Sequence, residues 1–296
     1  AVTAQVRVFD ETVPPTDLND SDGPDNVYGN SDDLVLSQTG PIPVTAGPAE
    51  RIILVHSGQT LNEGATSYAT ALMNSPVDRY SGTPFSIKVY LTDRFFNIKK
   101  DPVFDGRRVD VTAPSDTFGA SPGFVGFIDS AYGYAEFTGA NGVELRKAAT
   151  GQWLRAVTAP GGTLAAGQNT YPPTSPPGVT ASTFTVLAGA AKGIQILMPW
   201  ESPDAGTGKY DPANDPVVTG GKIIGSTVTF NAGIPFTVRT RIVDKYFNTV
   251  PLSAAGPEVA LWLNKPAWVA AAPDRFSAFI ATQPFLPDGT RDFNVT

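Results

Sequence analysis

Cysteine is absent from the 296-residue chain, and histidine occurs once, as His56. The chain therefore has no disulfide, thiol nucleophile or cysteine-based metal site, and a Ser-His-Asp arrangement would have to use His56. The 21 Lys and Arg residues are outnumbered by 28 Asp and Glu, and the net charge of −7 repels nucleic acid and anionic lipid. No apolar run reaches the roughly 20 residues of a membrane helix. We therefore expect no nucleic-acid partner and no membrane-spanning segment.

Glycine and proline are abundant, with 29 and 27 residues, while aromatic residues make up 10% of the chain. Disordered chains lack such apolar content, so the glycines and prolines are interpreted as turns between many short strands. We find no long helical periodicity. The sequence therefore predicts an all-β protein, with room for about two domains that have their own cores.

A long segment of the chain occurs twice. GTPFSIKVYLTDRFFN at 82–97 returns as GIPFTVRTRIVDKYFN at 233–248, and VTAGPAERIILV at 44–55 returns as VLAGAAKGIQIL at 186–197. The two pairs are offset by 151 and 142 residues, which places one insertion of nine residues between them. A period this long indicates a whole domain copied in tandem rather than a solenoid unit. Tandem modules are typical of proteins built for length, reach or assembly.

Both copies of the first motif predict an antiparallel strand followed by a turn. Apolar residues alternate with polar ones, so one face should be buried. The residues expected to face inward are Phe85, Ile87, Val89 and Leu91, with the counterparts Phe236, Val238 and Ile242. The pairs Asp93/Asn97 and Asp244/Asn248 are predicted to close equivalent, structural turns, because Asx side chains bond nearby backbone N–H groups. Further strands are expected at 51–56, 107–111, 134–138, 143–147, 153–158, 183–187, 194–198, 259–263 and 275–282.

Shorter matches place the ends of the chain within the repeat. AVTA at 1–4 matches AVTA at 156–159, and Asp288-Gly289 is aligned with Asn141-Gly142. The predicted domains are the C-terminal part of a preceding module at 1–45, a complete module at 46–187, and a module at 188–296 that lacks its last strand or strands. Two interpretations follow. The segment is a window of a longer array, or subunits join head to tail by donating Val2, Ala4, Val6 and Val8 to an open edge at 275–296.

These motifs resemble bacterial immunoglobulin-like repeats. The resemblance rests on Gly-x-Pro-Phe-[ST]-[IV], on Asp-x-x-x-Asn, and on the linker strand that runs into PWESPDAG at 199–206, and it covers most of the chain from Pro43 onward. It implies tandem immunoglobulin-like antiparallel β-sandwich domains of the kind found in large secreted and surface-layer proteins. The first copy departs from the second after the linker strand, with HSG at 56–58 in place of MPW at 198–200.

The functional hypothesis is a non-enzymatic, structural component of an extracellular assembly at the cell surface, either a surface layer or a surface filament. Its partners would be copies of itself, or further modules of the same long chain. An alternative is an adhesin or carbohydrate-binding surface protein that takes a cell-surface glycan, and another is an accessory domain of a secreted polysaccharide hydrolase. An exposed aromatic cluster would favour binding, whereas chain-to-chain contacts at both ends would favour assembly.

An acidic stretch offers a candidate calcium loop. Eight carboxylates lie between residues 10 and 33, and no Lys or Arg occurs between Arg7 and Arg51. The oxygen ligands expected around the central Gly23 are Asp17, Asn19, Asp20, Asp22 and Asp25. The stretch departs from the EF-hand pattern, because counting back from Gly23 puts Leu18 at the first ligand position. A solvated acidic loop is the alternative. A second candidate set in the inserted loop is Asp204, Asp211 and Asp215.

The remaining chemistry-bearing residues have structural interpretations. His56 aligns with Met198, an apolar position, which favours a packed or edge histidine over a catalytic base. GTGKY at 206–210 lacks the spacing of a phosphate loop and is interpreted as a turn. A sugar-stacking platform could draw on the four tryptophans, Trp153, Trp200, Trp262 and Trp268, but Trp262 is expected in a core and Trp200 at a domain interface. Asn294-Val-Thr296 is a glycosylation sequon.

Overall fold

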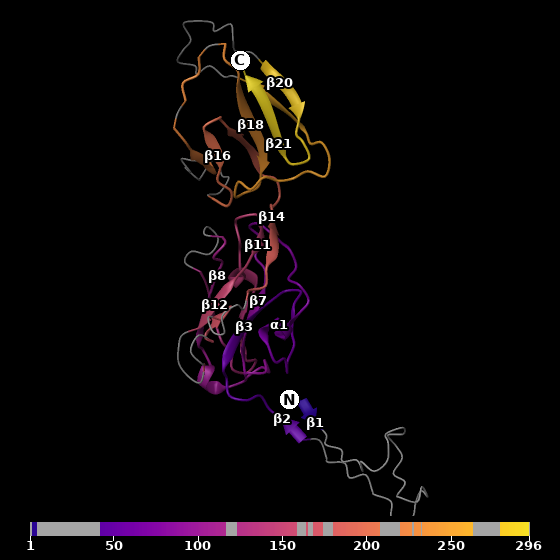
Figure 1. Cartoon of the computed structure of the whole chain (residues 1–296), viewed down its shortest axis with the longest axis vertical. Coiled ribbons are helices and arrows are strands. Elements are labelled where there is room, and N and C mark those ends of the chain that lie inside the picture. The colour runs from indigo at the N-terminus through magenta and orange to yellow at the C-terminus, as the bar shows by residue number, and fades with distance from the viewer. Residues whose placement is uncertain are drawn as a thin grey trace, which may run out of the picture. The chain divides into compact units, whose positions relative to one another are not determined.

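In this computed structural model the described residues are 2–4, 42–116, 123–158, 164, 168–173, 180–207, 220–226, 228–231, 233–262 and 279–295. Strands dominate these residues, and the helical elements among them are α1 (Tyr68–Ala71) and the single 3-10 turns Pro102–Phe104 and Gly139–Asn141 (Figure 1). Most strands pair antiparallel, so the predicted all-β class is confirmed. The chain divides into two compact units, residues 1–47 and residues 48–296.

The described part of the first unit is a single strand pair. Strands β1 (Val2–Ala4) and β2 (Ile42–Val44) run antiparallel, with Val2 opposite Val44. Val2 and Ala4 therefore pair with β2 in their own unit, and donation of this strand to a neighbour stays a prediction. The other residues of that expected strand, Val6 and Val8, lie outside the described residues.

The second unit begins with a sandwich-like region, residues 48–187, which we call the N-terminal region. Its described strands form three main sheets and a small hairpin. The first sheet has the order β10 (Tyr134–Phe137), β7 (Ile87–Thr92), β3 (Arg51–His56), and the second has the order β13 (Thr170–Tyr171), β12 (Arg155–Thr158), β8 (Arg108–Thr112), β9 (Phe124–Phe127). The third has the order β11 (Ala149–Gln152), β14 (Phe184–Leu187), β6 (Arg79–Tyr80), and the hairpin pairs β4 (Thr60–Leu61) with β5 (Leu72–Met73). Only the β14–β6 pair among these is parallel.

The alternating residues of β7 point into the core of this region. Phe85, Ile87, Val89 and Leu91 are all buried, as predicted. They belong to one apolar cluster that also contains Val109 and Val111 of β8 and Ala156 of β12. Since β8 and β12 belong to a different sheet from β7, the cluster lies between two sheets, which is the arrangement of a sandwich.

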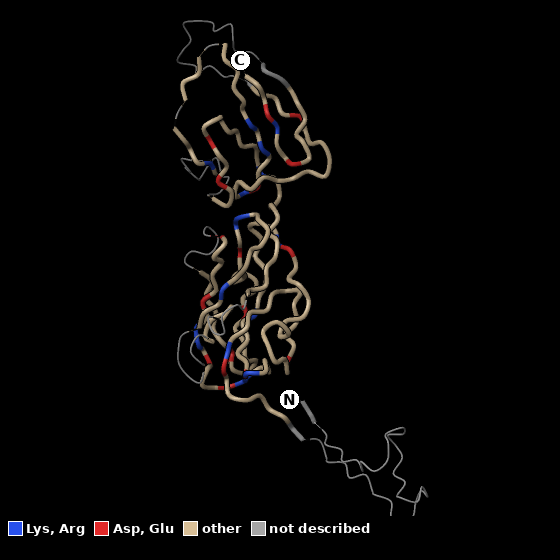
Figure 2. Tube along the Cα trace, in the orientation of Figure 1, with Lys and Arg blue, Asp and Glu red and all other residues tan. Residues whose placement is uncertain are grey.

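The C-terminal region, residues 188–295, repeats the central three-strand pattern. Its sheets are β15 (Gly193–Leu197), β18 (Phe236–Val243), β21 (Thr290–Val295); β16 (Glu201–Pro203), β17 (Lys222–Ile224); and β19 (Glu258–Trp262), β20 (Phe279–Pro284). Val238 and Ile242 are buried as predicted, whereas Phe236 is only partly buried. Phe285, Phe293 and Leu261 complete much of a second, separate apolar cluster. Lys and Arg are interspersed with Asp and Glu along both regions (Figure 2).

Matching hydrogen bonds align the two regions. The N–H of Leu91 in β7 donates to Gly133 O at 2.9 Å, and the N–H of Ile242 in β18 donates to Gly289 O at 2.9 Å. Gly289 therefore corresponds to Gly133, and the expected match to Asn141-Gly142 is wrong. Strand β21 is then the counterpart of β10.

Within the expected open edge at 275–296, the structure describes β20, which pairs with β19, and β21, which pairs with β18. Each stands last in the strand order of its sheet, so the open edge stays a prediction. One predicted strand is corrected. The strand expected at 143–147 is instead a loop with one isolated bridge, between Val143 and Phe85. The buried carboxylate of Asp116 accepts hydrogen bonds from two backbone N–H groups of that loop, which gives it a non-strand geometry.

The polar face of β18 is not uniformly exposed. Arg239 forms an exposed ion pair with Asp292 of β21. Arg241, two residues further, is buried, and its guanidinium donates to Gln195 Oε1 at 2.8 Å and to Thr249 Oγ1. Burial and the nearby charge of Arg239 lower the pKa of Arg241. A neutral amide and a hydroxyl therefore replace the carboxylate partner that a buried guanidinium commonly has.

No helix in the described part of the chain has both the length and the apolar character needed to cross a bilayer.

Candidate interaction site

The Asp-x-x-x-Asn motif forms the same turn in both regions. Asp93 Oδ1 accepts hydrogen bonds from the N–H of Phe95 at 2.8 Å and of Asn97 at 3.0 Å, and Asp93 Oδ2 accepts from Asn97 Nδ2 at 2.9 Å. In the second turn, the corresponding bonds to Asp244 measure 2.8, 3.0 and 2.8 Å. The predicted equivalence of the two turns is confirmed.

Each turn holds a phenylalanine in a left-handed backbone conformation. The φ angles are 60° for Phe96 and 62° for Phe247. A non-glycine residue in that region costs on the order of 1 kcal/mol, so the surrounding bonds must hold it there. The three hydrogen bonds to the aspartate provide that constraint in both turns.

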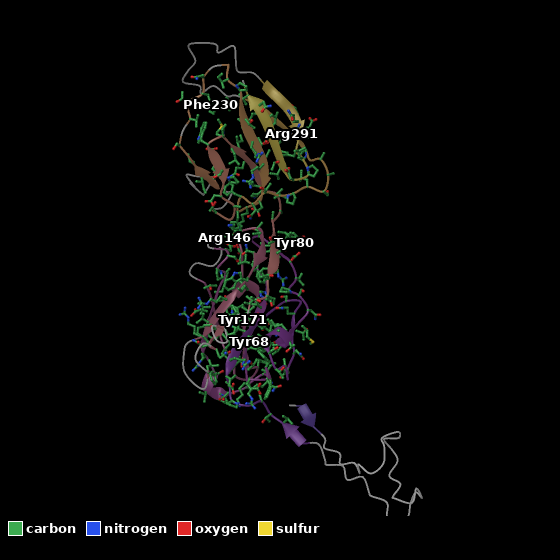
Figure 3. All side chains as sticks on the ribbon, viewed as in Figure 1. Tyr68, Tyr80, Arg146, Tyr171, Phe230 and Arg291 are labelled. Atoms are coloured by element: carbon green, nitrogen blue, oxygen red, sulfur yellow. The ribbon has the colours of Figure 1, made fainter. Side chains whose placement is uncertain are left out.

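The second turn contacts the N-terminal region through Asn248. Its Nδ2 lies 2.9 Å from Ser81 Oγ and 2.7 Å from Arg146 O, and its Oδ1 accepts the N–H of Ala148 at 2.8 Å. Asn248 is 1% exposed. One amide therefore bonds its own turn and two separate segments of the other region. We call these two segments, residues 80–82 and 144–148, the receiving end; Tyr80 and Arg146 of this end are labelled in Figure 3.

Tyr246 supplies the apolar part of the same junction. Its hydroxyl donates to Glu144, and its ring lies so close to Gly82 that a Cβ added there would be 2.7 Å from Cε2. Burial, followed by the bond to Glu144, raises the pKa of Tyr246 to about 12. The glycine thus leaves room for the ring, and the tyrosine stays neutral while it donates to the carboxylate.

The linker and the receiving end are held in place by further backbone contacts. The N–H of Gly189 in the linker donates to Asp244 Oδ2 at 2.8 Å. Asp116 Oδ2 accepts the N–H groups of Arg146 at 2.6 Å and Lys147 at 2.9 Å. Because Asp116 is fully buried, it fixes the backbone from which Arg146 O accepts Asn248. Separate hydrogen bonds therefore hold the linker and turn on one side of the junction and the receiving end on the other.

The first turn carries an aromatic ring and an asparagine amide at the same two positions, and both are more exposed than in the second turn. Phe95 is 40% exposed, whereas Tyr246 at the same position is 1% exposed. Asn97 is half-buried, and within the described residues its side chain bonds only to Asp93. The backbone behind each turn is also alike, since Gly64 N–H donates to Phe95 O at 2.9 Å and Gly206 N–H donates to Tyr246 O at 2.8 Å.

The candidate calcium ligands Asp17, Asn19, Asp20, Asp22 and Asp25 lie outside the described residues, as do Asp211 and Asp215. Asp204 is described, and its backbone bonds to Gly221 and Thr207. Within the described part of the chain, no group of three or more metal-binding side chains comes together. The calcium loop stays a prediction.

His56 is a packed core histidine, as predicted. It is buried, its ring centroid lies 5.0 Å from that of Phe184, and its Nε2 has no hydrogen-bond partner among the described residues. Burial and the charge of Arg79 lower the pKa of His56 to about 3. The ring is therefore neutral at physiological pH.

Two of the four tryptophans, Trp153 and Trp200, have side chains among the described residues. Trp200 lies in the turn after β15 and packs on Phe230 of its own region, at 5.5 Å between ring centroids, rather than at the domain interface that the sequence suggests. Trp153 is partly buried, and the side chains of Trp262 and Trp268 lie outside the described residues. Asn294 of the sequon is exposed on β21, and its Oδ1 accepts from Thr237 Oγ1 at 3.2 Å.

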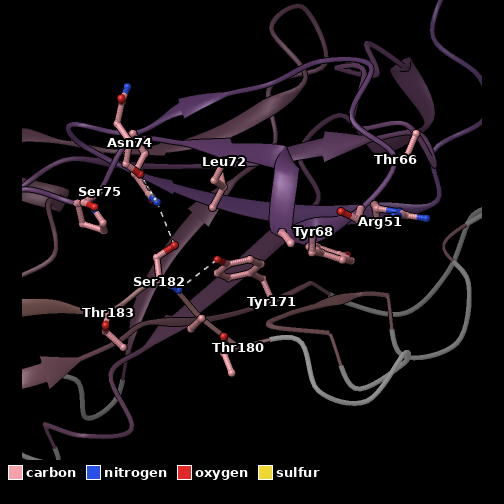
Figure 4. Close-up of a pocket in the computed structure, with 15 residues that line it drawn as sticks. Arg51, Thr66, Tyr68, Leu72, Asn74, Ser75, Tyr171, Thr180, Ser182 and Thr183 are labelled. Atoms are coloured by element: carbon pink, nitrogen blue, oxygen red, sulfur yellow. Dashed lines mark hydrogen bonds between the residues drawn. The ribbon is translucent and has the colours of Figure 1, made fainter.

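A polar groove of about 810 Å³ lies beside α1 in the N-terminal region (Figure 4). Hydroxyls and amides line much of it, including Tyr68, Asn74, Ser75 and Ser182, together with the cation Arg51, and none of its described lining residues is an Asp or Glu. Tyr68 packs edge-on against Phe96, and its hydroxyl donates to Gln168 Oε1 at 2.8 Å. The groove therefore offers hydrogen-bonding groups and one positive charge to a polar ligand, and its described lining holds no pair of carboxylates for acid–base chemistry.

The chain was also compared with family models and with curated proteins, and neither comparison gave a match.

Proposed function

We propose that the chain is a non-enzymatic, structural component of an extracellular assembly, a surface layer or surface filament, built from tandem immunoglobulin-like domains. The observation that supports this function most directly is the junction made by Tyr246 and Asn248, both 1% exposed, on the receiving end. Relative motion of the domains in one chain is the default unless their interface holds them together. A junction with buried, fully bonded polar groups keeps a fixed spacing between consecutive domains, which is what a lattice or filament requires.

The partners in this proposal are copies of the chain in a lattice or filament, or further domains of the same long chain. The duplication of the linker and the turn supports a serial arrangement, because each copy carries a linker followed by a docking turn. Cell-surface location and calcium binding in the acidic segment belong to the same proposal.

Immunogold labelling of intact producing cells, with antibodies against the 296-residue chain, tests this function. Regularly spaced label on unpermeabilised cells, on a lattice or filament visible in the electron microscope, is the expected result. Label that requires permeabilisation, as for an intracellular control protein, would contradict the proposal.

An adhesin or carbohydrate-binding surface protein is the second candidate function, and the groove beside α1 is the specific observation that favours it. Its hydroxyl and amide lining, with the one cation Arg51, matches the chemistry of a glycan. Binding of the chain to a glycan array, lost in Ser182→Ala and Asn74→Ala variants but kept in Val103→Ala, would support this function. Absence of binding to every glycan at millimolar concentration would contradict it.

A further inference from the structure

The turn at residues 93–97 has the geometry of a docking element whose partner surface is known from the second turn. Its aspartate bonds, its left-handed phenylalanine and its support from a glycine N–H all match those of the turn at 244–248. Its outward side chains, however, are more accessible than those of the second turn, since Phe95 is 40% exposed and Asn97 is half-buried. A turn of the same geometry in the same chain buries both positions against a β-sandwich end.

The cation next to the ring is also preserved. Arg94 Cζ lies 4.6 Å from the centroid of the Phe95 ring, and Lys245 Nζ lies 4.9 Å from that of Tyr246. A cation on one face of the ring fixes how the ring is presented, and it leaves the rest of the ring for a partner. Both turns therefore present an oriented aromatic ring beside an amide.

We propose that residues 93–97 dock onto the end of another β-sandwich domain, in the way that residues 244–248 dock onto the receiving end. The inference rests on the proposed function and names the partner surface within that assembly. This surface carries a glycine against the Phe95 ring, a hydroxyl and a main-chain carbonyl for Asn97 Nδ2, and a main-chain N–H for Asn97 Oδ1. The receiving end of this chain is already filled by its own second turn. The partner is therefore a domain whose receiving end is vacant.

The difference between Phe95 and Tyr246 sets the specificity of docking. Tyr246 donates its hydroxyl to Glu144, whereas Phe95 has no donor. A carboxylate facing Phe95 would lose water without gaining a hydrogen bond, which is costly. The partner of the first turn therefore carries an uncharged residue at the position of Glu144, and the two turns of the chain select different receiving ends.

The absence of cysteine makes a direct test possible. Single-cysteine variants Phe95→Cys, Tyr246→Cys and Val103→Cys, the last at a position 73% exposed in the same region as Phe95, are labelled with a maleimide. Labelling is measured in the assembly isolated from producing cells and in the dispersed chain. Because Phe95→Cys removes the ring that docks, protection of the wild-type Phe95 ring is measured by hydroxyl-radical footprinting of the assembly and of the dispersed chain. Unchanged melting temperatures of the dispersed variants confirm that they fold.

In the dispersed chain, the Phe95→Cys variant should label at a rate near that of Val103→Cys. The Tyr246→Cys variant should label at least about tenfold more slowly, because reagents reach a buried position only through local opening. In the wild-type assembly, oxidation of the Phe95 ring should slow by at least about tenfold relative to the dispersed chain. Oxidation of Tyr132, 56% exposed in the same region, should stay unchanged. An assembly in which wild-type Phe95 is oxidised at the dispersed rate would overturn this inference and leave the proposed function standing. Failure to find any assembly would remove both.

The identity of the partner surface is tested by attaching a maleimide–diazirine cross-linker to the single thiol of an Arg94→Cys variant, which keeps the neighbouring Phe95 ring, in the same assembly. Adducts are expected on a serine–glycine segment and on the loop that corresponds to residues 144–148 of a neighbouring domain. The inference would be overturned by adducts confined to other surfaces, or by adducts on Glu144 of this chain's own receiving end.

Discussion

The turns at 93–97 and 244–248 are alike in backbone and unlike in surroundings. Both use one aspartate to bond two backbone N–H groups and an asparagine amide, with distances that agree within 0.1 Å. Asp93 and Phe96 of the first turn are buried, but only the second turn also buries its two outward side chains, Tyr246 and Asn248. The aspartate therefore shapes the turn, and the residues at the positions of Tyr246 and Asn248 make the contact. Substitutions at matched positions separate these two roles.

The largest difference in the loss of unfolding free energy is expected between Asn248→Ala and Asn97→Ala. Both variants lose a bond to the turn aspartate, but Asn248→Ala also leaves the Ala148 N–H without its partner in a buried junction, whereas Arg146 O still accepts the Ser81 hydroxyl at 2.7 Å. An unsatisfied buried group costs about 1–3 kcal/mol, so we expect a loss of about 3 kcal/mol for Asn248→Ala and about 1 kcal/mol for Asn97→Ala. Calorimetric unfolding of the whole chain measures both. Equal losses would show that the junction contributes nothing beyond the turn.

The second comparison is between His56 and its counterpart Met198, and it concerns pH. Because the folded pKa of His56 is lowered to about 3 from the ordinary 6.5, its contribution to stability is complete above pH 6.5 and is lost as the pH falls toward 3. The slope is about 1.4 kcal/mol per pH unit in that window. His56→Met should remove this dependence while keeping an apolar contact with Phe184. Urea unfolding between pH 7 and about pH 4.5, within that window, measures the slope, and an unchanged slope in the variant would assign the acid sensitivity to other groups.

The third comparison concerns the two cores. Ile87 lies in the larger apolar cluster and Val238 in the smaller one, and both are buried. Deletion of side-chain carbons removes transfer free energy and leaves a cavity, so we expect losses of about 3 kcal/mol for Ile87→Ala and about 2 kcal/mol for Val238→Ala. Each loss should appear in the calorimetric transition of its own region. A change below about 0.5 kcal/mol at either site would contradict the inward orientation of that strand.

The smallest expected difference is between Gly206→Ala and Gly64→Ala. The two glycines have φ angles of 90° and 85°, so alanine strains both by a similar amount. An added Cβ at Gly206 would lie 2.9 Å from Lys147 Cβ and 3.1 Å from its Cα. At Gly64 no described atom beyond the adjacent residues lies within 4 Å of an added Cβ. We expect Gly206→Ala to lose about 1 kcal/mol more, because the receiving end must move. Equal melting temperatures for the two variants would contradict close packing at Lys147.

Local patterns predicted the fold class, the inward face of β7 and the geometry of both turns, because each depends on residues close together in sequence. The pairing partners of the second turn were missed. Ser81 and Arg146 lie 167 and 102 residues from Asn248, and contacts over such distances leave no local signature. Strand β21 was also missed, since its TRDFNV sequence places Arg291 and Asp292 in the middle of the strand. Trp200 was misplaced because its flanking prolines suggested a linker, whereas they belong to the turn after β15 and to β16.

The central claim is that the asparagine of the second turn is a docking residue as well as a turn residue. A double-mutant cycle between Ser81→Ala and Asn248→Ala, with unfolding free energies measured by calorimetry, tests it directly. Because Asn248 Nδ2 lies 2.9 Å from Ser81 Oγ, we predict a coupling of about 1–2 kcal/mol. The matched cycle between Ser81→Ala and Asn97→Ala should give less than about 0.5 kcal/mol. Zero coupling in the first cycle, or the same coupling in both, would contradict the account.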